Sequence, residues 1–483
     1  MTSATTLRQV PLCVDLDGTL IRTDLLFESL LDAVKRRWWI VFLLPLWLLQ
    51  GRAYLKQRVA ECAELDPAIL PYRPDLLAWL RQQRAEGRRM ILTTGANGKL
   101  AGDVAEHLQL FDEVMASDAT VSLTGRVKAH RLIGEFGEGG FDYAGDSSAD
   151  EAVWKHARGK IATGAAANHP QSFELVFAER ASKLHALIRA LRPKHWVKNV
   201  LVFVPLFAGH KFFDVSLVLR ACIAFAAFSL TASSVYIIND LADLASDRKH
   251  PIKRKRPFAA GDLPVQVGLW VAPAVLLAGL SLAFFLGQAT FGVVLGYLAL
   301  TFVYTFYLKR KLLTDVFALA ILYTLRMLAG GAATSVLCSM WLLAFSVFQF
   351  LSLAFLKRSA ELSNLARRQV QATSGRGYFT WDLVQVNVFG VTAAYMSSLV
   401  LGLYVTGDRV RVLYQQPAWL WILVPLHLYW MSRAWILSHR GAMNEDPIMF
   451  AFGDRVTYIC GAVAAVALFL ATHGGVTIPG VAQ

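Results

Sequence analysis

Cysteine and charge are both scarce in this chain. Five cysteines occur in 483 residues, and none shares a CxxC pair or another metal-ligand spacing. This pattern excludes a disulfide scaffold and a cysteine zinc site, and it is typical of small packing residues in a reducing compartment. Charged residues make up 17% against 55% hydrophobic residues, and the mean hydropathy is +0.43. A composition this apolar excludes an ordinary soluble protein and requires a membrane part.

A secretory signal is missing as well. The N-terminal stretch MTSATTLRQVPLCVDLDGTL has no charged region followed by an apolar run and a cleavage site, so we expect the first domain to stay in the cytoplasm. The net charge of +13 would suit nucleic acid, but the basic residues gather in short loops between apolar segments, and no basic recognition motif accompanies them. We therefore expect no nucleic-acid partner.

The long apolar runs begin only after residue 197. We predict a soluble, doubly wound α/β domain over residues 1–180, and an all-α membrane domain of about nine helices over residues 181–483. Basic clusters follow the second, fourth and sixth apolar segments, which places these loops in the cytoplasm, the C-terminus outside, and the chain in the inner (cytoplasmic) membrane as a multi-pass protein. The nine segments are 198–210, which contains Pro205, then 215–238, 265–287, 289–308, 313–334, 339–356, 384–404, 418–437 and 455–473.

Polar residues follow three predicted strands of the soluble domain. In DLDGT, Asp15 and Asp17 lie on one turn and share a face, so one carboxylate can attack phosphorus while the other acts as acid and base. Thr94, with Thr93 as the alternative, offers a hydroxyl to a phosphoryl oxygen, and Lys128 offers a cation. Because ligands bind at the carboxyl ends of parallel strands, we expect these groups to meet there with Asp146 and Asp150 of GDSSAD.

The order DxDGT, Thr, Lys, GDxxxD resembles the haloacid dehalogenase superfamily from Val14 to about Asp150. The resemblance implies that Asp15 is a nucleophile that becomes an aspartyl phosphate, and that Asp17 is the general acid and base. It also implies phosphate binding by Thr94 and Lys128, and a Mg²⁺ site made by Asp15, Asp17, Asp146 and Asp150.

An apolar insert interrupts the soluble pattern at residues 35–50, KRRWWIVFLLPLWLLQ. A spanning helix needs roughly 20 apolar residues, and this run has about a dozen, so it should lie in the membrane interface or form a buried helix of a cap near residues 25–70. A cap that touches lipid would indicate a lipid-linked phosphate as substrate.

The motif NDLADLASD ends the second apolar segment. On one helix Asn239, Asp243 and Asp247 would share a face with Asp240 beside them, and three carboxylates at a membrane boundary require a divalent cation, for which oxygen ligands indicate Mg²⁺. The basic run that follows is suited to a diphosphate leaving group through Arg248, His250, Lys253 and Arg256, although part of this run is equally explained by topology.

This region resembles the UbiA superfamily of intramembrane prenyltransferases. The stretches RPKHWVKN and DRKHPIKRKRPFAAG are most similar to its decaprenyl-phosphate phosphoribosyltransferase branch, which transfers 5-phosphoribose from phosphoribosyl pyrophosphate to a polyprenyl phosphate. The second aspartate motif is incomplete, because Asp315 is followed by leucine at position 319, and Asp315 could instead cap a helix. The further candidates for substrate binding are Lys194, Lys198, Asn199, Lys309, Arg326 and Lys357, with a topological alternative for Lys357.

The two halves together predict a bifunctional enzyme of the cell envelope, with a homo-oligomer as an open possibility. The membrane half would make a lipid-linked phosphoribose, and the phosphatase half would remove its 5-phosphate. One alternative is a prenyltransferase that uses a prenyl diphosphate donor, and another is a soluble domain with a purely regulatory role. A channel is disfavoured, because carboxylates gathered at one helix end suit a metal and a diphosphate better than a pore.

Overall fold

The structure is a computed structural model that describes residues 10–164, 166, 173–178, 182–367, 369, 376–443 and 447–473. The chain forms two compact units, which are described separately. The first comprises Met1–Pro193 and Ser233–Val275, and the second comprises Lys194–Ala232 and Leu276–Gln483. The domain boundary predicted at residues 180 and 181 lies outside the described residues, and the division made there stays a prediction.

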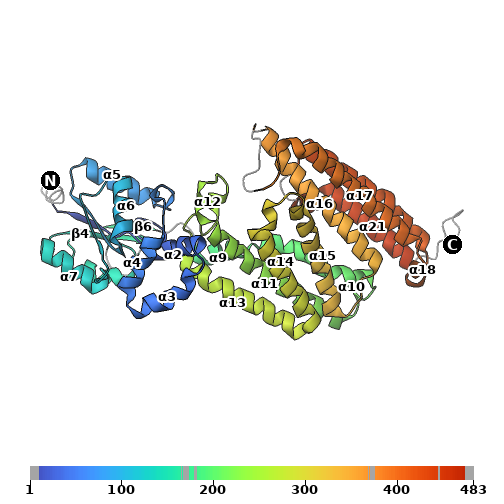
Figure 1. The fold of residues 1–483 in the computed structure, drawn as a ribbon, viewed down its shortest axis with the longest axis horizontal. Coiled ribbons are helices and arrows are strands. Elements are labelled where there is room, and N and C mark those ends of the chain that lie inside the picture. Colours follow the sequence, from blue (N-terminus) through green and yellow to red (C-terminus); the bar gives the residue numbers. More distant parts are fainter. Residues whose placement is uncertain are drawn as a thin grey trace. The chain divides into compact units, whose positions relative to one another are not determined.

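A six-stranded parallel sheet organises the first unit, in the order β3-β2-β1-β4-β5-β6 (Figure 1). Val14 of β1 lies opposite Leu92 of β2 and Ala144 of β4, so the three predicted strands are neighbours at the centre of the sheet. This confirms the doubly wound α/β class. The strands are β1 (Leu12–Val14), β2 (Met90–Asn97), β3 (Glu113–Ser117), β4 (Asp142–Gly145), β5 (Lys160–Gly164) and β6 (Leu175–Ala178).

Helices cover both faces of the sheet. Leu12 and Val14 pack into the core beneath α5 (Pro74–Ala85) and α6 (Gly98–Leu108), whereas Cys13 packs beneath α7 (Gly125–Phe136) and α8 (Glu151–Trp154). Successive residues of a strand point to opposite faces, and both faces of β1 are buried, which explains its unbroken apolar run. Each fully buried Leu or Val contributes about 1.5–3 kcal/mol to folding, so the centre of the sheet is the stable base on which the loops at its carboxyl edge stand.

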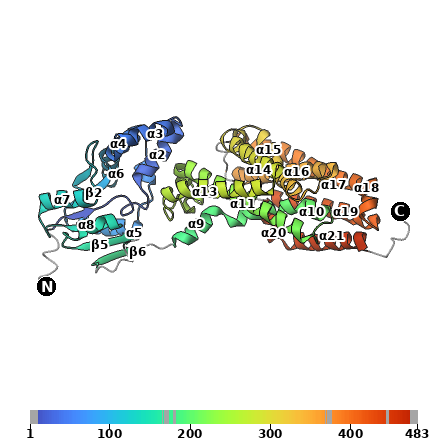
Figure 2. The ribbon, with the colours of Figure 1, turned by 90° about the horizontal axis from the view of Figure 1, so that it is seen from below.

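Three cap helices follow β1, and Figure 2 shows them beside one another. They are α2 (Leu25–Arg36), α3 (Ile40–Leu49) and α4 (Arg52–Cys62). The Asp24 side chain accepts the N–H of Leu26 at 2.9 Å, so it caps α2 and ends the loop that leads from β1. A small core of Ala33, Ile40, Trp47 and Val59 holds the three helices together.

The remainder of the first unit packs on α2. It contains α9 (Lys183–Leu191), the C-terminal part of α11 (Val215–Ala242), α12 (Leu244–Lys249), the 3₁₀ turn η5 (Lys253–Lys255) and the beginning of α13 (Val265–Leu286). Phe27 and Leu31 of α2 contact the core formed by Ile237, Leu241 and Phe258. The aspartate motif that ends α11 therefore shares a hydrophobic core with the cap of the sheet domain.

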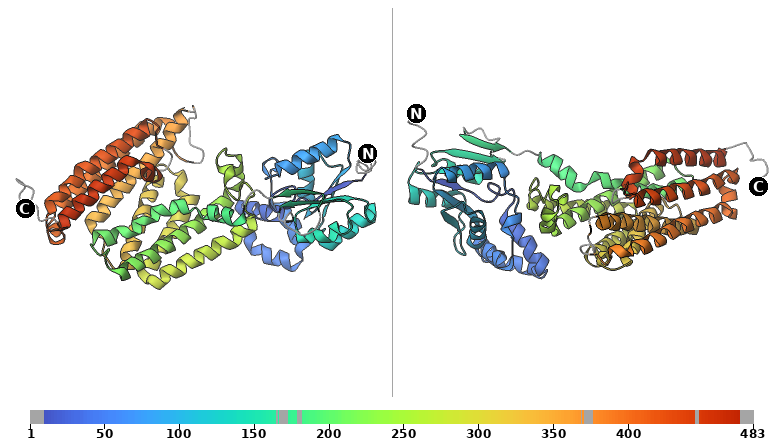
Figure 3. Two further views of the ribbon diagram at one scale, coloured as in Figure 1. Left: turned by 180° about the vertical axis from the view of Figure 1, so that it is seen from behind. Right: turned by 90° about the horizontal axis from the view of Figure 1, so that it is seen from above.

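The second unit is helical, and Figure 3 shows α16, α17, α19 and α21 packed side by side. Its N-terminal part is the 3₁₀ helix η4 (Pro193–Phe203), α10 (Val204–Ala208) and the start of α11. The rest, after α13, comprises α14 (Gln288–Phe306), η6 (Leu308–Arg310), α15 (Thr314–Thr334), α16 (Met340–Arg367), η7 (Thr380–Asp382), α17 (Leu383–Val405), α18 (Asp408–Leu413), η8 (Pro417–Ile422), α19 (Leu423–His439), α20 (Pro447–Gly453) and α21 (Arg455–His473).

Among the described residues, eight helices are long and apolar enough to cross a membrane. They match eight of the nine predicted segments, from α11 to α21, and the chain is a multi-pass membrane protein. The first predicted segment, residues 198–210, was expected to be short and to be tilted or broken at Pro205. It consists of the end of η4, a 3₁₀ helix that began at Pro193, and the five residues of α10, with Pro205 in its first turn.

Candidate active sites

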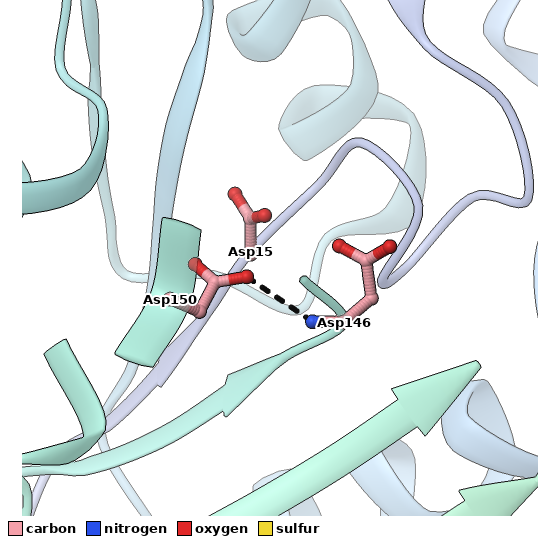
Figure 4. Close-up of side chains that lie close together, drawn as sticks. All are labelled: Asp15, Asp146 and Asp150. Atoms are coloured by element: carbon pink, nitrogen blue, oxygen red, sulfur yellow. Dashed lines mark hydrogen bonds between the residues drawn. The ribbon is translucent and has the colours of Figure 1, made fainter. Parts of the chain in front are cut away.

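Three carboxylates meet at the carboxyl edge of the sheet (Figure 4). Asp15 follows β1, Asp146 follows β4, and Asp150 lies on the turn after Asp146, with ligand oxygens all within 4.8 Å of one another. The Asp150 carboxylate also accepts the backbone N–H groups of Asp146 and Ser147 at 3.2 Å, which keeps the turn closed. These are three of the four residues predicted to hold Mg²⁺, brought together because β1 and β4 are adjacent parallel strands.

Lys128 of α7 lies within this cluster, as the motif order indicated. Its Nζ is 2.8 Å from Asp15 and 3.5 Å from Asp150, and the side chain is almost completely buried. Tyr143 completes the arrangement, because its hydroxyl accepts from Lys128 at 2.8 Å and donates to Asp150 at 2.6 Å. Sequence reasoning missed Tyr143, since it lies in β4 among residues that read only as sheet core.

Burial controls the charge of the cluster. Burial raises the pKa of Asp15 to about 6, although Lys128 opposes the shift, and burial together with the charge of Asp15 raises the pKa of Asp146 to about 7. Buried carboxylates this close repel unless a proton or a cation lies among them. The donor set, all oxygen and all carboxylate, fits Mg²⁺, which when bound there would neutralise both the carboxylates and an incoming phosphate.

Asp17 points toward the cap. Its Oδ1 accepts the N–H of Leu25 at 2.9 Å, and burial, with the charge of Asp24 next, raises its pKa well above the usual range. Gly18 makes the turn possible, since it has a φ of +76° and an added Cβ would lie 2.3 Å from Asp146 Oδ2. A protonated carboxyl in this place is suited to act as a general acid.

A small pocket opens next to Asp17, between the cap and the sheet. Lys56 of α4 reaches into it and donates to the carbonyl of Gly95 at 2.6 Å. No sequence pattern points to Lys56, because only the fold brings the cap to the C-terminal part of β2. The other lining residues are Asp24, Leu25, Leu26, Ser29, Val59, Ala96, Asn97 and Leu100.

Thr93 and Thr94 are both completely buried in the middle of β2. The Thr94 hydroxyl accepts the N–H of Ala96 at 3.0 Å, in the part of β2 where the pairing with β3 shifts register. The choice between the two threonines as the phosphate-binding hydroxyl stays open.

The spacing predicted that the membrane aspartates lie on one uninterrupted helix. The structure shows that they do not. α11 ends at Ala242, and Asp243 stands at the N-cap of α12 with φ −97° and ψ 11°. Asp240 and Asp247 are buried, and Asp243 is more exposed. In the described part of the chain, only the group of Asp15 brings three potential metal ligands within 4.8 Å, so the aspartates of this motif lie further apart than that.

Two arginines join the aspartates. Arg256 Nη1 lies 3.1 Å from Asp240 and 2.6 Å from Asp247, and Arg192 Nη2 lies 2.5 Å from Asp240. Arg192 follows the last residue of α9 and has a φ of 54°, a backbone conformation that costs less free energy for glycine than for other residues. The ion pair that its side chain makes with Asp240 explains why an arginine occupies this position. Arg192 was missed as a site residue although it begins the basic stretch RPKHWVKN.

Two oxygens of this cluster have no hydrogen-bond partner among the described residues. They are Asn239 Oδ1 and Asp240 Oδ2, and both are buried. A buried acceptor without a donor costs about 1–3 kcal/mol, and a bound cation would supply what is missing. The oxygen donors present fit Mg²⁺, and Asp240 and Asp247 would hold such an ion, with Asn239 and Asp243 nearby.

Three of the predicted diphosphate ligands, Arg248, His250 and Lys253, have different surroundings in the structure. Arg248 donates to both oxygens of Glu28 and to the carbonyl of Ala259. His250 Nδ1 accepts the N–H groups of Ile252 and Lys253 at 3.2 and 3.3 Å, and the Lys253 side chain is exposed on η5. A diphosphate contact by Arg248 would need Glu28 to release it, and these three assignments stay predictions.

Within the second unit, the structure joins Asn199 to Arg326. Arg326 donates to Asn199 Oδ1 at 2.8 Å, to the hydroxyl of Tyr297 at 3.2 Å and to the carbonyl of Leu322. The buried guanidinium is therefore satisfied by protein groups, and its predicted phosphate contact is not required to explain its burial. The remaining lysines are exposed or half-buried, and their phosphate contacts stay predictions: Lys194 and Lys198 on η4, Lys309 on η6 and Lys357 on α16.

Asp315 is completely buried and tied to the core of the second unit. It accepts the hydroxyl of Tyr378 at 2.7 Å and pairs with Arg358, which is itself fully buried. The side chain thus bonds to other elements instead of capping α15. A carboxylate neutralised in this way is poorly placed to serve as the second metal motif of a prenyltransferase.

Comparison with known proteins agrees with both halves. The model of the UbiA prenyltransferase family matches residues 200–453, and that of haloacid dehalogenase-like hydrolases matches residues 12–150. A protein of Sinorhizobium fredii named only as uncharacterized protein y4nM is 37% identical over 474 residues, covering 96% of this chain and 91% of that one.

The decaprenyl-phosphate phosphoribosyltransferase of Mycobacterium tuberculosis is 37% identical over 201 residues, 41% of this chain and 66% of that one. A solved structure of a UbiA homologue from Archaeoglobus fulgidus, bound to GPP and Mg²⁺, aligns with 59% of this chain and 99% of its own at 16% identity and a TM-score of 0.45. Because the family model matches more than half of the chain, the chain belongs to the UbiA prenyltransferase family, and it carries a haloacid dehalogenase-like domain before its membrane helices.

Proposed function

We propose that the membrane half transfers 5-phosphoribose from phosphoribosyl pyrophosphate to a polyprenyl phosphate, and that the soluble half then removes the 5-phosphate. The observation that carries the first step is the cluster of Asp240, Asp247, Arg192 and Arg256 with its two unpartnered oxygens. The name of the mycobacterial relative supports the same transferred group, phosphoribosyl, and the same class of acceptor, a polyprenyl phosphate. The product would be polyprenylphosphoryl ribose, a sugar donor for envelope glycans.

The transfer needs a leaving group held by positive charge. Arg192 and Arg256 would bind the diphosphate of the donor, and Mg²⁺ on the aspartates would neutralise its remaining charge. An oxygen of the polyprenyl phosphate then attacks the anomeric carbon of the ribose. The bond from that carbon to the diphosphate breaks, and pyrophosphate leaves with the electron pair.

The hydrolysis needs a nucleophile and an acid at one phosphate. Asp15, which Lys128 holds at 2.8 Å, attacks phosphorus, and the bond to the ribose 5-oxygen breaks. Asp17, whose raised pKa favours its protonated form, gives the proton to that oxygen. It then takes a proton from the water that attacks the aspartyl phosphate, which releases inorganic phosphate and restores both carboxyl groups.

The second candidate is transfer from a prenyl diphosphate donor, which the description of the matched family favours. The same diphosphate cluster would serve such a donor. The engagement of Asp315 by Arg358 and Tyr378 weighs against it, because one aspartate motif then remains available for metal.

The test uses the full-length protein in lipid nanodiscs with Mg²⁺, a polyprenyl phosphate and radiolabelled phosphoribosyl pyrophosphate. The parent should form lipid-linked ribose, and Asp15→Asn should stop at lipid-linked phosphoribose. Arg256→Gln should lower total labelled lipid by about 100-fold, since losing a buried charge partner costs roughly 2–5 kcal/mol.

Arg254→Gln, which changes an exposed arginine on η5, is the matched control and should stay within about twofold of the parent. Absence of labelled lipid from every variant, together with turnover of a prenyl diphosphate, would replace the proposal with the second candidate. Formation of labelled lipid-linked ribose by Asp15→Asn would show that the soluble domain does not remove the 5-phosphate.

A further inference from the structure

The cap helix α3 has no polar side chain in its sequence IVFLLPLWLL. Ile40 and Trp47, seven residues apart on one face, are the two buried residues of the helix, and they pack against Ala33 of α2 and Val59 of α4. Leu43 and Leu44 are partly buried against the same core, and the other apolar side chains point out of the cap. Its large exposed residues, with the two that precede the helix, are Trp38, Trp39, Val41, Phe42, Leu46, Leu48 and Leu49.

This exposure is too large for a surface that meets water. Phe42 is 69% exposed, Leu46 55% and Leu49 84%. Contiguous apolar patches on soluble proteins mark a contact with another protein or with a membrane. Of the two interpretations left open for this insert, a helix buried within the cap is therefore the less suitable.

The position of α3 indicates what covers it. Lys35, near the end of α2, donates to the carbonyl of Ala242 at 2.8 Å, and Ala242 is the last residue of α11, a helix long enough to cross a membrane. α3 begins five residues after Lys35, so within the first unit the helix starts next to a membrane boundary. Its ten residues span about 15 Å, half of the hydrocarbon core, so α3 cannot cross.

Charge and aromatic residues at the ends of α3 favour lipid over protein as the partner. Arg37 precedes the helix and Arg52 follows it, both exposed and without a side-chain ion pair or hydrogen bond in the part of the chain that the structure describes. Trp38 and Trp39 stand at the N-terminal end, where amphipathic aromatic rings suit the headgroup level. Exposed arginines next to an apolar helix suit anionic phospholipid headgroups.

We propose that α3, with Trp38 and Trp39, is embedded in the cytoplasmic surface of the lipid bilayer as a helix that lies in the interface. α4 packs on α3 and carries Lys56, which lines the pocket beside Asp17. A cap seated in lipid therefore holds this pocket close to the membrane surface. Resting on the proposed phosphatase function, this makes a lipid-borne phosphate the substrate class of the pocket.

The first test measures position without any activity. Leu46→Cys is labelled with a fluorophore in full-length protein whose five native cysteines are replaced, reconstituted in vesicles of phosphatidylethanolamine and phosphatidylglycerol. The matched control is Val127→Cys on α7, also apolar and exposed. Lipid-attached quenchers should quench position 46 several-fold more than position 127, and iodide in water should do the reverse. Protection of position 46 from both quenchers would mean that protein covers α3, a second copy included, and would overturn the proposal, as would quenching by iodide alone.

The second test measures substrate choice. Leu46→Glu places a charge where lipid is expected and leaves the pocket unchanged, with Val127→Glu as control. Hydrolysis of a lipid-borne phosphomonoester in the same vesicles should fall about tenfold for Leu46→Glu, while hydrolysis of a soluble phosphomonoester should stay within twofold. Equal loss on both substrates would show that α3 is packing only. Quenching from lipid without any phosphatase activity in the parent would leave α3 in the membrane and reject the phosphatase.

Discussion

Arg248 and Glu28 form a buried, two-pronged ion pair across 220 residues of sequence. Arg248 Nη1 and Nη2 donate to the two Glu28 oxygens at 3.0 and 2.6 Å, and the side chains are 6% and 3% exposed. The hydroxyl of Thr23 donates to the same carboxylate at 2.7 Å. Within the first unit, this links the residue after the last aspartate of the membrane motif to the helix that follows the phosphatase loop.

Glu28→Gln should destabilise the protein strongly. The change keeps the shape of the side chain but leaves the Arg248 guanidinium buried without its counter-charge, which costs roughly 3–5 kcal/mol. The melting temperature of the full-length protein in detergent measures the loss. A double variant with Arg248→Met should recover part of it, because it removes the unpaired charge.

The neighbouring residue supplies the control for this pair. Lys249 pairs with Asp66 at 3.2 Å, but the two side chains are 62% and 46% exposed. Asp66→Asn should therefore cost less than about 1 kcal/mol. Equal effects of Glu28→Gln and Asp66→Asn would show that the Arg248 pair is no stronger than a surface contact.

Lys56→Met should weaken substrate binding by the phosphatase and spare the transferase. The ammonium group lies in the pocket beside Asp17, where the substrate phosphate must pass, and methionine keeps most of the side-chain volume. We expect KM to rise about tenfold with a smaller change in kcat, which corresponds to about 1.4 kcal/mol of uniform binding. Lys99→Met, on the neighbouring helix α6, is the control. A similar rise in its KM would show that the loss of any nearby positive charge, and not of the pocket contact, weakens binding.

Mg²⁺ should stabilise the protein more at high pH than at low pH. The pKa values of Asp15 and Asp146 rise from 3.8 to about 6 and about 7, so between roughly pH 4 and 7 the folded chain holds protons that the unfolded chain releases. In the absence of divalent cations, stability is therefore lost as the pH rises through this window. Mg²⁺ can replace the protons only once they leave, so the rise in melting temperature with Mg²⁺ should be larger at roughly pH 8 than at pH 5.

Two variants check the origin of this effect. Asp146→Asn should reduce both the dependence on pH and the Mg²⁺ effect, because it takes away one carboxyl with a raised pKa that is also a candidate metal ligand. Asp118→Asn, in an exposed loop, should leave both unchanged. An undiminished Mg²⁺ effect in Asp146→Asn would place the responsible ion elsewhere, at the membrane aspartates.

The phosphatase centre could be predicted because its residues belong to strand ends. Asp15 and Asp146 each follow an apolar strand, and parallel strands end at one edge of a sheet, so their meeting required no knowledge of distant contacts. Tyr143 could not be found in this way, since its hydroxyl matters only because Lys128 comes to it from α7. Lys56 is similar, because it depends on how the cap folds over β2.

The membrane half shows where spacing alone misleads. Spacing of three and four residues assumes an unbroken helix, and Asp243 interrupts it with backbone angles that are not helical. Hydropathy likewise detected residues 198–210 as apolar but could not distinguish an α-helix from the narrower 3₁₀ form of η4. Arg326 was expected to contact an anion, yet its guanidinium donates to the neutral groups of Asn199 and Tyr297. The sequence argument considered only charged partners and therefore did not find them.

The separation of Glu28 from Arg248 in the sequence also means that the two residues are synthesised at different times. Ribosomes add about 5–20 residues per second, so Arg248 emerges about 10–45 s after Glu28. During that interval the nascent cap has no guanidinium for Glu28, and Phe27 and Leu31 lack the surface of Ile237 and Leu241. The sheet domain is thus synthesised first but is completed only after the second half of α11 and Arg248 have been made.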